Sequence, residues 1–124
     1  MSALYYNAKR KTPLTKEELL VIDHILKKYL SNKEAISVAE KGGGELFSFS
    51  TNPEPPTVLN GSTKLPVDLF PDDIDDFIYV AEHWIDLISE LKNTITNAEW
   101  SASLDDQPLS WNESKKKFDY PKTH

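Results

Sequence analysis

Apolar residues recur every three or four positions along one stretch of this chain, residues 72–95. At about 100° per residue they fall on a single arc, which is the pattern of a helix with one buried side. The start is marked by Pro71 and the carboxylates after it, because acidic side chains satisfy the unpaired amides of a first helical turn. The spacing predicts a long amphipathic helix over residues 72–95, with a buried arc of Ile74, Phe77, Ile78, Ala81, Trp84, Ile85, Ile88, Leu91 and Ile95.

The opposite side of this predicted helix is acidic. Residues 65–91 contain eight acidic residues and no Lys or Arg. A solvated helix surface usually mixes both signs, because opposite charges four residues apart attract each other. A surface of one sign that also carries aromatic groups favours an interface, although solubility alone is the alternative explanation. The predicted partner-binding residues are Asp72, Asp75, Asp76, Tyr79, Glu82, His83, Asp86 and Glu90.

The length of 124 residues predicts a single domain over residues 1–124. The chain has no cysteine, which excludes disulfides and thiolate metal or redox chemistry. No segment resembles a signal peptide or reaches the roughly 20 apolar residues of a membrane span, so we expect a soluble cytoplasmic protein. The net charge of −6 disfavours nucleic acid and favours a basic partner.

The N-terminal half predicts a strand and a helix, followed by a less regular region. Leu4 to Tyr6 form a β-prone run. Thr15 and Glu18 fit a capping box that starts a helix ending at Ser31 or Asn32. Residues 35–39 fit either a short helix or a strand. Three glycines at 42–44 then break regular structure, and the Glu after them argues against a phosphate-binding loop.

The rest of the chain reads mainly as strands on either side of the long helix. Alternation predicts a strand over 46–50, and three prolines predict a loop over 51–56. Asn60-Gly61 predicts a hairpin between strands 57–59 and 62–65. Residues 98–104 alternate as a strand, Asp105, Asp106 and Pro108 turn the chain, and short strands follow at 109–111 and 118–120.

This order of elements predicts an α+β fold. The expected architecture is a two-layer sandwich, in which two main helices cover one face of an antiparallel sheet. The order is βαββαβ-like, as in ferredoxin-like split βαβ folds, with extra C-terminal strands.

No catalytic, metal-binding or cofactor motif is evident. The aspartates at 72–76 lack the glycine and spacing of a calcium loop, so helix capping explains them more simply. No two histidines have metal-ligand spacing, although His83 precedes Asp86 by three residues and a contact between them is possible. No serine lies in a nucleophile elbow. The lysines at 115–117 fit a solvated turn better than a nucleic-acid site.

These features predict a non-enzymatic acidic protein that neutralises a basic protein partner. An immunity protein or antitoxin that covers a bacterial nuclease toxin is the physiological example, because a nuclease surface is basic where it binds phosphate. One alternative is a small-ligand-binding or hydrolytic domain that uses the open sheet face, with Tyr5, Trp100 and Trp111 lining a cleft. Another is a homo-oligomeric structural domain that pairs through its sheet edge or C-terminal region.

Overall fold

A computed structural model describes residues 2–52, 54–67 and 74–121. None of the helices in these ranges has the length and hydropathy of a membrane span. The elements, in chain order, are β1 (Ala3–Lys9), α1 (Lys16–Leu30), α2 (Lys33–Lys41), β2 (Ser50–Thr51), β3 (Thr57–Lys64), α3 (Ile74–Thr94), β4 (Glu99–Leu104), β5 (Gln107–Pro108), β6 (Trp111–Asn112) and β7 (Lys117–Phe118).

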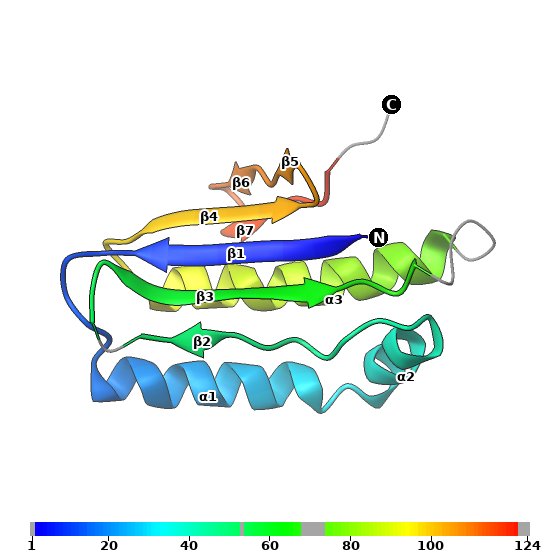
Figure 1. The fold of residues 1–124 in the computed structure, drawn as a ribbon, viewed down its shortest axis with the longest axis horizontal. Coiled ribbons are helices and arrows are strands. Elements are labelled where there is room, and N and C mark those ends of the chain that lie inside the picture. The colour runs from blue at the N-terminus through cyan, green and yellow to red at the C-terminus, as the bar shows by residue number, and fades with distance from the viewer. Residues whose placement is uncertain (1, 53, 68–73, 122–124) are drawn as a thin grey trace.

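The main sheet has five antiparallel strands in the order β2-β3-β1-β4-β5. The first strand is therefore central: Tyr6 lies opposite Gly61 of β3 on one side and Ala102 of β4 on the other. Figure 1 shows α3 passing behind β1 and β3, with α1 on the β2 side and running in the opposite direction to α3. This arrangement confirms the predicted α+β sandwich with a βαββαβ-like order and extra C-terminal strands.

The side chains of β1 alternate between the face of the sheet that the helices cover and the open face. Leu4, Tyr6 and Ala8 are buried on the side of the helices, whereas the intervening Tyr5 is 50% exposed. This alternation follows from the two-residue period of a strand. The open face is polar, as is common for antiparallel sheets with one solvated side.

Helix α3 is the centre of the core and confirms the predicted long helix. It contacts α1, α2, β1 and β7, and Trp84 in its middle is completely buried. Because α1 and β7 lie along its two flanks, burial extends past the predicted arc to Leu87 and Ser89. The prediction that Ile74 is buried is wrong, since this residue is 39% exposed at the first turn. Residues 72 and 73, which we predicted to start the helix, lie outside the described residues.

The N-terminal helices agree with their predicted caps. Thr15 Oγ1 accepts a hydrogen bond from the Glu18 amide at 3.1 Å, and a Glu18 carboxylate oxygen accepts one from the Thr15 amide at 2.8 Å. Ser31 caps the C-terminus of α1. Residues 35–39, for which helix and strand were both open, belong to α2, which Asn32 caps by accepting from the Ala35 amide.

The predicted hairpin at Asn60-Gly61 is wrong. Residues 57–64 form one continuous strand, β3, between β1 and β2. The glycine is needed for close packing and not for a turn. A Cβ on Gly61 would lie 2.7 Å from the Ser48 carbonyl oxygen and 2.7 Å from Cε2 of Tyr6.

The strand predicted over 46–50 is also largely wrong, because β2 comprises only Ser50 and Thr51. The alternation of residues 46–50 reflects side-chain packing. Phe47 is 2% exposed and stacks on the Tyr6 ring with centroids 4.6 Å apart, and the Tyr6 hydroxyl donates to the Ser48 carbonyl. Residues 46–49 are therefore held to the core by aromatic side chains, and strand pairing begins only at Ser50.

The strand predicted at 98–104 is present as β4, whereas β6 and β7 each share only one residue with the strands predicted at 109–111 and 118–120, and Pro108 lies in β5 and not in a turn. Strand β4 pairs with β1, and β6 and β7 form a small separate hairpin against α3. Trp111 packs edge-on against Phe118 at 5.0 Å between centroids, and the Lys92 ammonium lies 4.4 Å from the Trp111 ring centre. The hairpin thus covers the C-terminal half of α3.

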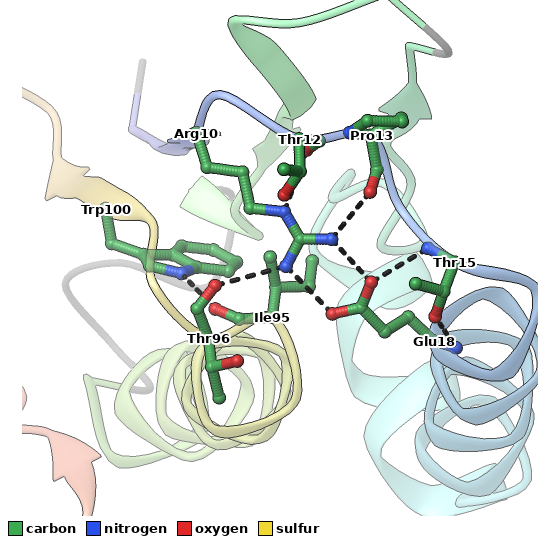
Figure 2. A network of polar contacts seen from close by, with 8 residues as sticks. All are labelled: Arg10, Thr12, Pro13, Thr15, Glu18, Ile95, Thr96 and Trp100. Atoms are coloured by element: carbon green, nitrogen blue, oxygen red, sulfur yellow. Dashed lines mark hydrogen bonds and ion pairs between the residues drawn. The ribbon is translucent and has the colours of Figure 1, made fainter.

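Arg10 joins the β1–α1 connection to the first turn of α1 and to the segment after α3, at the end of the sheet (Figure 2). Its Nε–H donates to the Thr12 carbonyl at 2.9 Å. Nη1 donates to Glu18 at 2.8 Å and to the Thr96 carbonyl at 3.1 Å, and Nη2 donates to Glu18 and to the Pro13 carbonyl. All five guanidinium N–H groups can therefore be satisfied. The Arg10 and Glu18 side chains are only 7% and 16% exposed, so this pair lies within the structure.

This ion pair predicts a loss of stability in acid. The hydrogen bonds from Arg10 outweigh burial and lower the pKa of Glu18 from 4.5 to about 2. A lowered pKa contributes stability above the unfolded value, and the contribution is lost as the pH falls from about 4.5 toward 2. We expect it to be worth about 3 kcal/mol at pH 7. Urea unfolding from pH 7 to pH 2 should show a shallower pH dependence for Glu18→Gln, and equal slopes for both proteins would contradict this assignment.

Candidate interaction surface on α3

Seven of the eight predicted partner-binding residues lie in the described part of α3, and Asp72 lies outside it. They project from the side of the helix that faces away from the sheet. One flank of this side meets α1 and the other meets β7. The neighbours along these flanks divide the predicted surface into two parts.

The α1 flank contains a polar network. Glu90 accepts hydrogen bonds from the Lys28 ammonium at 2.8 Å and from the Tyr29 hydroxyl. Nε2 of His83 lies 2.9 Å from the Tyr29 carbonyl oxygen, and the His83 and Tyr29 rings are 5.0 Å apart. His83 and Glu90 therefore help to hold the end of α1 against α3.

The ionisation of this network reflects its partial burial. Burial raises the pKa of Tyr29, and the hydrogen bond to the Glu90 carboxylate raises it further. Burial raises the pKa of Glu90, but the hydrogen bonds from Lys28 and Tyr29 and the charge of Lys28 together outweigh it, so the pKa is lowered. At neutral pH the network thus pairs an ionised carboxylate with an ammonium and a neutral phenol.

The β7 flank neutralises another predicted residue. The Asp86 carboxylate lies 3.0 Å from the Lys117 ammonium, and these side chains are 43% and 37% exposed. Further toward the start of α3, Glu82 is exposed. Burial raises the pKa of Tyr120, and the charge of Glu82 raises it further.

The carboxylates nearer the start of α3 form no salt bridge with another described residue. Within residues 2–52, 54–67 and 74–121, no salt bridge involves Asp75, Asp76 or Glu82. Tyr79 lies among them and is 36% exposed, and its hydroxyl accepts a 3.4 Å hydrogen bond from the Asn32 amide. We call Asp75, Asp76, Tyr79 and Glu82 the N-terminal acidic patch.

Sequence reasoning missed the cations that divide the surface. Lys28 and Lys117 lie far from α3 in the sequence. The residue pattern around each lysine does not indicate which helix the lysine will contact in the folded protein. Local i, i+4 spacing had suggested that the acidic side carries a single sign of charge. Tertiary contacts supply the opposite sign at Asp86 and Glu90.

The structure does not bring together the residues proposed for a cleft on the open sheet face. Trp100 lies opposite Ala8 in the sheet, so it points toward the helices, and its indole N–H donates to the Ile95 carbonyl. Trp111 lies in the separate β6–β7 hairpin. Only Tyr5 of the three is on the open face.

The described residues offer no assembled metal site. Within them, no group of three or more His, Asp or Glu side chains converges. Half of the aspartate run at 72–76 lies outside the described ranges. His83 contacts the Tyr29 carbonyl and Asp86 pairs with Lys117, so these two side chains are directed to different neighbours.

Comparison of the chain with protein-family models, with curated proteins and with solved structures finds no match.

Proposed function

We propose that this protein binds a basic region of another protein through the N-terminal acidic patch of α3. The observation that carries this proposal is that Asp75, Asp76 and Glu82 have no salt-bridge partner in the described part of the chain, whereas Asp86 and Glu90 do. Exposed charges of one sign attract an oppositely charged partner and speed its association.

Exposed apolar groups beside these carboxylates support a protein partner. Ile74 and Tyr79 are 39% and 36% exposed at the same end of α3. Aromatic residues are enriched among interface residues that contribute most to affinity. A basic surface that also offers apolar contacts is the matching partner, and a nuclease toxin covered by an immunity protein or antitoxin is the class that we propose.

A charge-reversal variant tests the proposal. Tagged wild-type protein and the triple variant Asp75→Lys/Asp76→Lys/Glu82→Lys are used to capture proteins from native lysate, and the affinity for the captured partner is then measured at several salt concentrations. We expect a basic partner whose affinity falls about 10- to 100-fold in the variant, with a weaker salt dependence.

The matched control is Glu40→Lys/Glu54→Lys/Asp106→Lys. It makes the same change in net charge at exposed positions outside α3. We expect this control to retain most of the affinity. Equal losses in the two variants would show that only net charge matters, and an unchanged affinity in the α3 variant would overturn the proposal.

A further inference from the structure

A depression of about 750 Å³ lies at the end of the sheet where β1 leads into α1. This is within the size range of small-molecule sites. It is formed by residues 9–12, by Pro56 before β3, and by residues 97–99 after α3. The depression is therefore at the opposite end of α3 from the N-terminal acidic patch, and an inference drawn from it does not depend on the proposed function.

The walls of this depression are held in place by Arg10. Its guanidinium ties the β1–α1 connection to Glu18 of α1 and to the Thr96 carbonyl after α3 (Figure 2). Its backbone amide donates to the Pro56 carbonyl at 2.8 Å. Because each guanidinium N–H already has an acceptor, Arg10 organises the site and leaves ligand binding to its neighbours.

Two neighbouring lysines give the depression a positive charge. Lys9 and Lys11 are exposed, and neither forms a salt bridge within the described ranges. Glu99, which lies opposite Lys9 in the β1–β4 register, is the acidic residue of the lining. Since Arg10 is paired to Glu18, the other charged residues of the lining are two lysines and one glutamate, which leaves a net positive charge. The protein as a whole has a net charge of −6. The depression therefore attracts an anion.

The remaining surface of the depression is mostly apolar. Pro56 and Ala98 contribute to it, and the methylene stems of long lysine side chains cover apolar surface while their ammonium groups remain in water. We propose that this depression binds a small organic anion with a flat apolar body. Lys9 and Lys11 bind the carboxylate or sulfonate, and the body packs against Pro56 and Ala98.

The test compares two ligands of similar shape and different charge. Backbone amide shifts of the protein are followed by NMR during titration with 2-naphthoate and with the neutral 2-naphthylmethanol. We expect saturable shifts for 2-naphthoate, centred on residues 9–12 and 97–99. We expect its affinity to exceed that of the neutral compound by about fivefold or more, because charges about 4 Å apart at a protein surface attract appreciably.

Two lysine variants test whether Lys9 and Lys11 bind the anion. Lys9→Gln/Lys11→Gln should weaken 2-naphthoate binding about fivefold or more. The matched control is Lys33→Gln/Lys41→Gln, which removes two exposed lysines of α2 and should leave binding unchanged. Equal binding of the neutral compound, shifts spread over the whole protein, or equal weakening in both variants would overturn the proposal.

Discussion

Replacement of Arg10 by Ala is expected to lower the free energy of unfolding by about 3 to 5 kcal/mol. The change leaves the Glu18 carboxylate, whose side chain is 16% exposed, without its cation. It also removes the donors to the carbonyls of Thr12, Pro13 and Thr96. Small domains are typically stable by about 5 to 15 kcal/mol, so the loss is a large part of the total.

Urea unfolding followed by tryptophan fluorescence measures this effect. Lys11→Ala is the control, because its side chain is exposed and belongs to no salt bridge in the described chain. It should change stability by no more than about 0.5 kcal/mol. Arg10→Lys should fall between the two, since an ammonium cannot reproduce the planar fork that binds a carboxylate with two parallel bonds. A loss of less than 1 kcal/mol for Arg10→Ala would contradict the assignment of this network.

Replacement of Gly61 by Ala is expected to cost about 3 kcal/mol, at the upper end of the usual range for overpacking. The new methyl group would lie 2.7 Å from the Ser48 carbonyl oxygen, a backbone atom that cannot rotate away. It would also lie 2.7 Å from the Tyr6 ring, which is buried and hydrogen-bonded to Thr63 and Ser48. Relief of the overlap requires the segment around Ser48 to move off the sheet.

Thermal unfolding of Gly61→Ala and of Ser62→Ala separates this packing effect from a general effect on β3. Ser62 is exposed on the open face, next to Gly61 in the strand. We expect a lowered midpoint for the first variant only. A similar midpoint for both would show that the close approach at Gly61 is not required.

The sequence predicted best the elements whose signals are local. One is the capping box of Thr15 and Glu18, and another is the helical spacing of apolar residues along α3. Both depend on residues a few positions apart, and both are present as expected. The hairpin predicted at Asn60-Gly61 was wrong because glycine occurs both in tight turns and where another segment approaches the backbone closely. Only the position of Ser48 and Tyr6 in the folded protein distinguishes the two uses.

The candidate surface was predictable only in part, for a related reason. Periodicity placed the acidic side of α3 opposite its buried arc. The pairing of Asp86 with Lys117 and of Glu90 with Lys28 depends on how α1 and β7 dock on that helix. The role of Arg10 was not predictable from its place among basic residues, because its acceptors are the Glu18 carboxylate and backbone carbonyls of the β1–α1 connection and of Thr96 after α3.

The central position of β1 has a consequence for the timing of folding. This strand is made early, but its neighbour β4 follows about 95 residues later, with Leu4 opposite Leu104. Translation adds about 5 to 20 residues per second, so roughly 5 to 20 s pass between the synthesis of β1 and that of β4. Pairing over such a long sequence separation also slows the final step, because the chain must close a large loop first. We therefore expect β1 to pair with β3 first and with β4 in a later step of folding.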